Sequence, residues 1–257
     1  MASTAPVTHV KTIPWAVYAQ SVKGHYELWV NQKRVGRTAE GGAFLVPANH
    51  QMKIVHHTIN GAMEINWLHI QCTLFGTLDI LSLMDLPLIL SPVQARPLGE
   101  MASKVRALQK KTPTLESILE SKKAGFDIVR KIALLGTPRI GKESPAAGLE
   151  RLRPLIEGFR GNHDKLLDLA DMARLVGLSV PRLHALFKST LGVSPHRYFA
   201  DLRLKQAAIQ LMTTELSVDA IGLAHGYDDP FHFSRNFKKW SGLSPTAYRI
   251  QREQPGA

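Results

Sequence analysis

Short apolar runs separated by turn residues fill the first third of the chain. The runs have the length of β-strands and cover residues 15–19, 26–30, 43–46, 53–55 and 62–74. Gly-Gly and Asn-Gly pairs lie between them, and Asn60-Gly61 is a strong hairpin signal because both residues tolerate a positive φ. Many short strands joined by such turns predict a small β-sandwich or β-barrel over residues 1–93.

The hydrophobic period lengthens to that of a helix after Pro97. Apolar residues at helical spacing predict two helices, over residues 98–111 and 113–135, with Thr112 as the N-cap of the second. A stretch rich in glycine and proline then predicts a linker, and the rest of the chain has helical spacing. The predicted fold class is α+β, with a β domain over 1–93, a helical segment over 94–136, a linker over 137–148 and an all-α domain over 149–257.

The C-terminal region repeats itself at an offset of 50 residues. Six residues of the first copy return with the same type in the second: Phe187, Lys188, Gly192, Ser194, Pro195 and Tyr198 become Phe237, Lys238, Gly242, Ser244, Pro245 and Tyr248. Upstream the offset is 49, which pairs Ala173 with Gly222 and Gly177 with Gly226. Two copies of one helical unit are predicted, whereas a solenoid needs three or more.

Each copy has the order helix, glycine turn, helix. Gly177 and Gly226 suit the left-handed conformation that ends a helix, and Ser179 and Asp229 follow as N-caps. This order predicts a helix-turn-helix. The two units are expected over residues 166–191 and 217–240, with second helices over 180–191 and 230–240.

The angular positions of residues on these second helices separate core from surface. At 100° per residue, the faces expected to be buried carry Leu183, Leu186, Phe187 and Thr190, and Phe233, Asn236, Phe237 and Trp240. The candidate DNA-contacting residues are Pro181, Arg182, His184, Ala185, Lys188, Phe231, His232, Ser234, Arg235, Lys238 and Lys239. Arginine forks onto guanine O6 and N7, an exposed phenylalanine fits a thymine methyl group, and lysines suit phosphates.

The charge balance favours a polyanionic partner. The chain has 32 basic and 21 acidic residues, a formal net charge of +11 and a pI near 9.9. Residues 1–93 carry 6 basic and 5 acidic residues, so the excess lies in the later two thirds and nucleic acid is the first expectation. With no apolar run of 18 residues, no secretory signal pattern and one cysteine, we expect a cytoplasmic protein without a membrane span or disulfide.

Both copies resemble the signature of the AraC/XylS family of transcriptional regulators. The matching residues of the second copy are Ile221, Ala224, Gly226, Tyr227, Asp229, Phe233, Ser234, Arg235, Phe237 and Lys238, and the resemblance of the two copies covers about 100 residues. It implies double-stranded DNA as partner and two recognition helices in successive major grooves, roughly 34 Å apart. Two positions depart from the family pattern: Ala185 stands where an arginine is common, and Gly222 replaces the usual alanine.

The β region resembles the cupin-like sensor domain found in that family, through Gly42, Pro47, His50, Trp67 and His69. This resemblance implies an effector pocket inside the barrel and helices within 94–136 that mediate dimerisation. We predict that His50, Trp67 and His69 contact a small-molecule effector. Alternation over residues 64–74 places Trp67 and His69 on one face of a strand, but two assignments stay open, because either face could line the barrel.

The sequence therefore predicts a homodimeric, sequence-specific transcription regulator that responds to a small molecule and acts with RNA polymerase. No nucleophile with a supporting base, phosphate-binding glycine loop or carboxylate pair stands out, so we expect no enzyme activity, no cofactor and no metal. Two alternatives stay open. One is a cupin-type metalloenzyme with an appended helical domain, whose imidazole ligands would be His50, His56, His57 and His69. The other is an effector-independent DNA-binding regulator.

Overall fold

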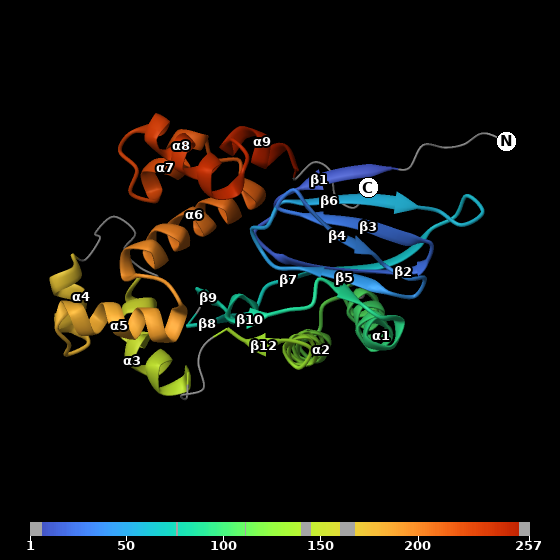
Figure 1. The fold of residues 1–257 in the computed structure, drawn as a ribbon, viewed down its shortest axis with the longest axis horizontal. Coiled ribbons are helices and arrows are strands. Elements are labelled where there is room, and N and C mark those ends of the chain that lie inside the picture. The colour runs from blue at the N-terminus through green and yellow to red at the C-terminus, as the bar shows by residue number, and fades with distance from the viewer. Residues whose placement is uncertain (1–6, 76, 111, 140–144, 160–167, 252–257) are drawn as a thin grey trace. The chain divides into compact units, whose positions relative to one another are not determined.

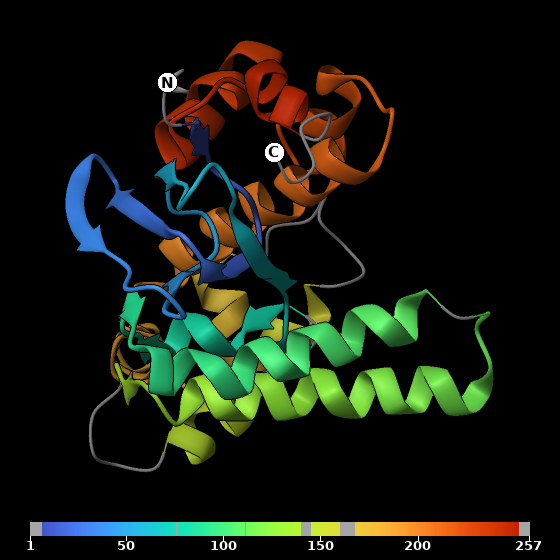
Figure 2. The same ribbon diagram turned by 90° about the vertical axis from the view of Figure 1, so that its right-hand side faces the viewer.

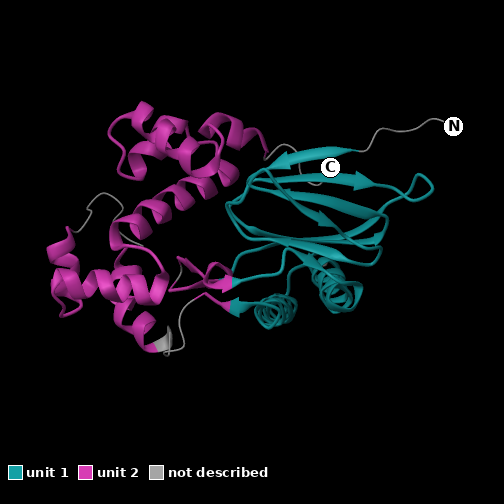
Figure 3. Cartoon of the chain, in the orientation of Figure 1, with its two compact units in different colours: residues 1–72, 85–137 teal, residues 73–84, 138–257 magenta. Residues whose placement is uncertain are grey.

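The computed structural model describes residues 7–75, 77–110, 112–139, 145–159 and 168–251 (Figure 1, Figure 2). The chain divides into two compact units (Figure 3). Unit 1 comprises residues 1–72 and 85–137, and unit 2 comprises residues 73–84 and 138–257. The sheets lie in unit 1 and the C-terminal helices in unit 2, which confirms the α+β class.

Unit 1 contains two four-stranded antiparallel sheets among its described residues, with strand orders β1-β6-β3-β4 and β11-β5-β2-β7. The strands are β1 (Thr8–Lys11), β2 (Ala16–Lys23), β3 (His25–Val30), β4 (Lys33–Arg37), β5 (Ala43–Val46), β6 (Met52–His57), β7 (Glu64–Ile70) and β11 (Ile89–Leu90). The predicted runs all contain strands, but β1, β4 and β11 were not predicted. Asn60 and Gly61 have φ of 52° and 73°, as their turn requires.

The register of the second sheet defines its inner face. Ala19 on β2 pairs with Phe44 on β5 and with Trp67 on β7, so these three side chains share one face. The Phe44 ring meets the Tyr26 ring of the first sheet edge-on, with 5.0 Å between centroids. That face therefore looks into the sandwich. Trp67 and, two residues on, His69 point inward, which decides between the two assignments that the sequence left open.

Helix α1 (Pro92–Gln109) covers the outer face of the second sheet. The Tyr18 hydroxyl donates to the carbonyl oxygen of Ala95 at 2.8 Å, and the Ser103 hydroxyl donates to Oδ1 of Asn66 at 3.1 Å. These bonds anchor the helix to β2 and β7, the two strands that are neighbours in the sheet.

Helix α2 (Leu115–Ala133) packs along α1 as the second arm of a helical hairpin (Figure 2). Both helices begin elsewhere than the sequence predicted. A capping box places the start of α1 at Pro92, and the helix continues through Pro97 at the cost of one backbone hydrogen bond. The N-cap of α2 is Thr114 rather than Thr112, because Thr114 forms the capping box.

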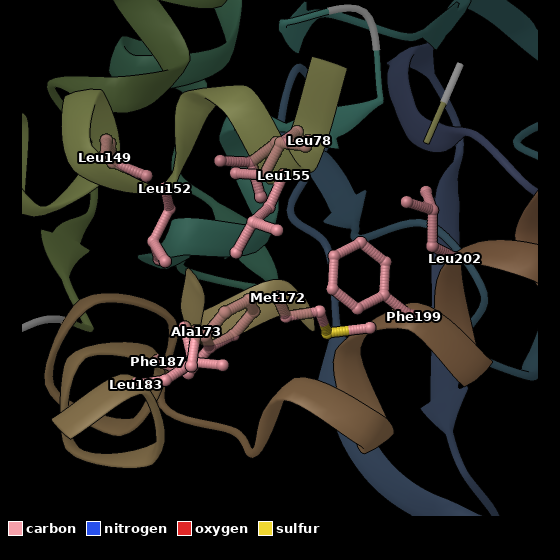
Figure 4. Packing of buried hydrophobic residues seen from close by; sticks show 11 residues of the cluster. Leu78, Leu149, Leu152, Leu155, Met172, Ala173, Leu183, Phe187, Phe199 and Leu202 are labelled. Carbon is pink, nitrogen blue, oxygen red and sulfur yellow. The ribbon is translucent and has the colours of Figure 1, made fainter. Parts of the chain in front are cut away.

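The C-terminal helices of unit 2 form the two helix-turn-helix units, α4–α5 and α7–α8, which α6 connects. Their bounds are α3 (Pro145–Gly158), α4 (Leu169–Leu175), α5 (Val180–Leu191), α6 (Pro195–Thr213), α7 (Val218–Ala224), α8 (Pro230–Ser241) and α9 (Pro245–Ile250). One buried cluster joins α3 to α6 (Figure 4); its members include Leu149, Leu152, Leu155, Met172, Ala173, Leu183, Phe187, Phe199 and Leu202. Residues 140–144 of the predicted linker and residues 166 and 167 lie outside the described residues.

A segment from the strand-rich part of the chain completes this cluster. It holds β8 (Thr73–Leu74), β9 (Leu78–Asp79) and the 3-10 helix Ile80–Leu83, and ends where β10 (Met84–Asp85) pairs with β12 (Thr137–Pro138). Leu78 is 4% exposed within the cluster (Figure 4). Phe75 packs against the same cluster. Carboxylate Oδ2 of Asp79 lies 3.4 Å from Nζ of Lys205 on α6, and both side chains are buried.

Residues 73–84 thus belong to unit 2, although the sequence placed them in the β domain 1–93. The reason is that an apolar stretch following a strand has the pattern of a continued strand. Its packing partners lie far along the chain: Asp79 and Lys205, for example, are 126 positions apart.

Candidate nucleic-acid interface

The turns before α5 and α8 share one backbone geometry. Gly177 and Gly226 have φ of 64° and 74°, a conformation that L side chains rarely adopt. The N–H of the next residue donates to the carbonyl oxygen five residues back, at 2.8 Å in the first copy and 3.1 Å in the second. Asp229 accepts hydrogen bonds from two backbone N–H groups of α8, whereas Ser179 occupies the N-cap of α5 without a side-chain bond.

Exposure along the two helices repeats residue for residue. The succession of exposed, half-buried and buried positions is the same over residues 181–189 and 231–239. The fully buried side chains are Leu183, Phe187, Phe233 and Phe237. Both helices therefore bury the face that the hydrophobic periodicity predicted. The exposed candidates are Pro181, Arg182, Ala185, Lys188, Phe231, His232, Arg235, Lys238 and Lys239, and the half-buried ones are His184 and Ser234.

The exposed faces are basic, but the two helices differ in side-chain geometry. Neither helix contains an acidic residue. On α5, Nζ of Lys188 donates to the carbonyl oxygen of Gly192 at 3.0 Å, so this cation is held over the helix end. On α8, the Arg235 guanidinium lies 3.9 Å from the Asp229 carboxylate, and Phe231 is 78% exposed. The second helix therefore offers the larger set of exposed basic and aromatic groups.

Gly222 allows α7 and α8 to approach each other closely. A Cβ at this position would lie 3.1 Å from ring atoms Cγ and Cδ1 of Phe233. In the first copy the corresponding residues are Ala173 and Leu183. Alanine is larger than the glycine at 222, and leucine is smaller than the phenylalanine at 233. The glycine at position 222, where the family usually has alanine, therefore leaves room for the Phe233 ring of the facing helix.

Helix α6 contacts both helix-turn-helix units. The Phe199 ring lies 5.9 Å from that of Phe187 in the first unit. The Arg203 guanidinium lies 5.4 Å from the ring centroid of Tyr227 in the second unit, close enough for a cation–π interaction. Because one continuous helix holds both units, α5 and α8 are parts of one scaffold.

Comparison with known proteins identifies this scaffold. Residues 172–251 match a family model described as a helix-turn-helix domain. The arabinose operon regulatory protein of Escherichia coli (strain K12) is 40% identical over 91 residues, 35% of this chain and 31% of that protein. These matches confirm the resemblance of residues 172–251 to the AraC/XylS family. The MmsAB operon regulatory protein of Pseudomonas aeruginosa is 34% identical over 151 residues, which are 55% of this chain and 48% of that protein.

The chain spans about a third to a half of the curated relatives' length, 31% and 48% for these two. Apo ToxT from Vibrio cholerae strain SCE256 is similar along the whole chain, with 18% identity and a TM-score of 0.55 over 96% of this chain and 94% of ToxT. That similarity shows that this chain and ToxT share a fold.

The residues predicted to contact an effector are only partly brought together in the structure. Trp67 and His69 are in contact, with ring centroids 5.0 Å apart, and Trp15 stacks on His69 at 5.6 Å. His50 lies in the loop after β5, where its Nδ1 is 3.0 Å from the carbonyl oxygen of Ala48. The sequence did not place Trp15 beside His69, because this contact depends on the pairing of distant strands rather than on spacing along the chain.

The histidines considered as metal ligands point in different directions. His56 pairs with Tyr26 and His57 with His25, on opposite faces of β6. The described part of the chain holds no group of three or more His, Cys, Asp or Glu side chains placed to bind a metal ion. Among the described helices, none combines the length and the hydropathy needed to cross a membrane.

Proposed function

We propose that this protein is a transcription regulator that binds double-stranded DNA in a sequence-specific manner through α5 and α8. The observation that carries the proposal is the duplicated exposure pattern, which presents basic and no acidic side chains at equivalent positions of both helices. Helices of this kind enter successive major grooves about one helical turn, roughly 34 Å, apart. The net charge of +11 favours association with a polyanion.

The residue roles follow from side-chain chemistry. Arg235 and Arg182 are assigned to guanine O6 and N7, and Phe231 to a thymine methyl group. Lys238 and Lys239 are assigned to phosphates, which position the protein but do not specify sequence. Ala185 cannot donate a hydrogen bond from its side chain, so we assign most of the sequence specificity to α8.

Substitution of Arg235 and Lys238 tests these roles. The full-length protein is used to select genomic DNA fragments, and the selected site is then titrated at several salt concentrations. We expect Arg235→Ala to cost about 1–3 kcal/mol on that site and to relax specificity at one base pair. Lys238→Ala is expected to weaken specific and random DNA equally and to reduce the salt slope by about 1.

The control for charge is Arg96→Ala, an exposed arginine of unit 1 that pairs with Glu100. It removes the same charge outside the recognition helices and is expected to leave both affinities nearly unchanged. Equal losses on specific and random DNA for Arg235→Ala would contradict its assigned role. Absence of any preferred fragment would contradict the function itself.

We further propose regulation by a small molecule bound between the two sheets, near Trp67 and His69. On this proposal the protein acts as a homodimer with RNA polymerase in the cytoplasm and carries out no catalysis. A small-metabolite panel separates this proposal from effector-independent regulation, since a bound ligand raises the melting temperature by mass action. No stabilising compound and unchanged DNA binding across the panel would favour the effector-independent regulator.

A further inference from the structure

The N-cap of α8 is a carboxylate that the helix itself holds in place. Oδ1 of Asp229 accepts a hydrogen bond from the backbone N–H of Phe231 at 2.9 Å, and Oδ2 accepts one from that of His232 at 3.1 Å. Because both oxygens are bonded to the backbone, rotation of the carboxylate is restricted. In most exposed ion pairs both side chains lose rotamer freedom, whereas here the acidic partner is already ordered.

The guanidinium of Arg235 lies beside this ordered carboxylate. Its Nη2 atom is 3.9 Å from Oδ2 of Asp229, a distance typical of an ion pair rather than of a hydrogen bond. The Arg235 side chain is 75% exposed and the Asp229 side chain 53%, so a ligand that reaches the helix can contact both. A guanidinium has five N–H groups, so an arginine directed by one carboxylate still has donors for O6 and N7 of a guanine.

The first helix-turn-helix unit lacks both members of this pair. At the offset of 50 residues, Ser179 corresponds to Asp229, and Ala185 corresponds to Arg235. Ser179 forms no side-chain cap bond, and α5 nevertheless begins directly after it. An acidic cap is therefore not needed to start a recognition helix in this scaffold. The acid occurs in the copy that has an arginine for it to direct.

A carboxylate at this place opposes the binding of DNA as such. The N-terminal residues of a recognition helix lie nearest to the base edges, and a negative charge there is repelled by the phosphates. Neither α5 nor α8 contains an acidic residue, so Asp229 adjoins a helix that is otherwise free of negative charge. A group that weakens binding to every sequence but restrains a base-reading side chain increases the discrimination between sequences.

We propose that Asp229 is a positioning residue for sequence readout, which restrains the Arg235 guanidinium toward the guanine of one base pair and repels DNA phosphates. Both effects increase the preference for that base pair relative to other DNA. This inference rests on the proposed function and specifies how the second recognition helix selects its sequence.

Asp229→Asn separates the charge of this residue from its role as a cap. Asparagine is as good an N-cap as aspartate, so the melting temperature is expected to stay unchanged. The full-length protein is titrated with its selected DNA site, with random DNA, and with the site altered at the base pair that Arg235→Ala identifies. We expect Asp229→Asn to lower the preference for the original base pair about fivefold, because Arg235 must then be ordered on binding. Affinity for random DNA is expected to rise.

Asp228→Asn is the matched control. Asp228 is the neighbouring residue, is exposed as well, and is not the N-cap of α8. Its substitution removes the same charge one residue away. It is expected to raise the affinity for random DNA by a similar factor and to leave the preference at the base pair unchanged. A second test variant, Asp229→Ser, reproduces the cap residue of the first copy and is expected to behave as Asp229→Asn does.

Combination with Arg235→Ala shows whether Asp229 acts through the arginine. In the Arg235→Ala background, Asp229→Asn is expected to have no further effect on the preference at this base pair, so the two effects are not additive. A residue that served only as a cap would change the melting temperature, and would change DNA affinity equally in both backgrounds.

The outcomes distinguish this inference from the function on which it rests. An unchanged base preference in both Asp229 variants, the same loss in Asp228→Asn, or the same loss in the absence of Arg235 would overturn the positioning role. So would an Arg235→Ala variant that loses preference at no base pair. If the wild type selects a DNA site in these cases, the proposed function stands without the inference. If the wild type selects no site, both fall.

Discussion

Gly222 and Phe233 illustrate how two copies of one unit reach the same backbone with different side chains. The space that a methyl group occupies at Ala173 is filled in the second copy by part of the Phe233 ring. The intrinsic helix propensity of glycine is about 1 kcal/mol worse than that of alanine, so Gly222→Ala would stabilise an isolated helix. Inside the protein the new methyl group lies only 3.1 Å from the ring, and repulsion opposes that gain.

We therefore expect Gly222→Ala to destabilise unit 2 by about 1–3 kcal/mol, the usual cost of overpacking a core. Phe233→Leu removes the ring and creates a cavity. The double variant reproduces the Ala173–Leu183 combination and is expected to be more stable than the sum of the single effects. Thermal melts of the four proteins give the coupling energy. Additive effects would show that the contact between Gly222 and Phe233 does not control the packing.

At the scale of elements, the segment 73–84 is held to α6 by a buried ion pair. The side chains of Asp79 and Lys205 are 6% and 11% exposed. Removing one partner leaves a buried charge without its counter-ion, which typically costs about 3–5 kcal/mol. We expect Lys205→Met and Asp79→Asn each to lower the melting temperature of unit 2, and the double variant to lower it by less than their sum.

Helix α6 also supplies the control. Arg197 and Asp201 form an exposed ion pair at 2.8 Å on the same helix. Exposed pairs contribute about 0–1 kcal/mol, so Asp201→Asn is expected to change the melting temperature little. Similar effects of Asp79→Asn and Asp201→Asn would contradict the structural role of the segment.

The elements that the sequence predicted best are those specified by local signals. Glycines at Gly177 and Gly226, and the periodic burial of Phe187 and Phe237, located α5 and α8 to within a residue. These features require only neighbours in the chain, and their repetition at a fixed offset made the pattern distinct from ordinary amphipathic helices.

The features that the sequence missed depend on distant partners. Nothing near β1 (Thr8–Lys11) indicates a strand, because its stability comes from pairing with β6, more than 40 residues later. His9 and Lys11 on β1 therefore did not enter the predicted effector site, whose residues Trp67 and His69 lie on β7 of the other sheet. The assignment of residues 73–84 failed for the same reason, since their burial comes from α3 and α6.

At the scale of the whole molecule, α2 exposes an apolar stripe in unit 1. The exposed members are Leu115, Ile118, Leu119 and Phe126, whose spacings of three, one and seven residues keep all four on one side of the helix. Such a stripe on one face of a helix is typical of helix–helix association. We expect Leu119→Glu to weaken self-association at least tenfold in sedimentation experiments without lowering the melting temperature, because the side chain is exposed.

Glu120→Gln changes the adjacent exposed residue outside the stripe and is expected to leave self-association unchanged. If Leu119→Glu sediments as the wild type does, the stripe is not the dimer contact. DNA affinity measured in parallel is expected to fall for Leu119→Glu only on sites with two copies of the recognised sequence, since two linked binding events raise the overall affinity.

The insertion of residues 73–84 into unit 2 has a consequence for the exchange of parts between related regulators. A crossover at residues 137–148 looks safe from the chain order, but it would join a foreign copy of Leu78 and Asp79 to this protein's α3 and α6. In hybrid proteins joined at these residues, the core of unit 2 would combine residues 73–84 of one parent with helices α3 to α6 of the other. Successful recombinants should either swap both stretches together or come from parents that agree at the positions facing Leu78, Asp79 and Lys205.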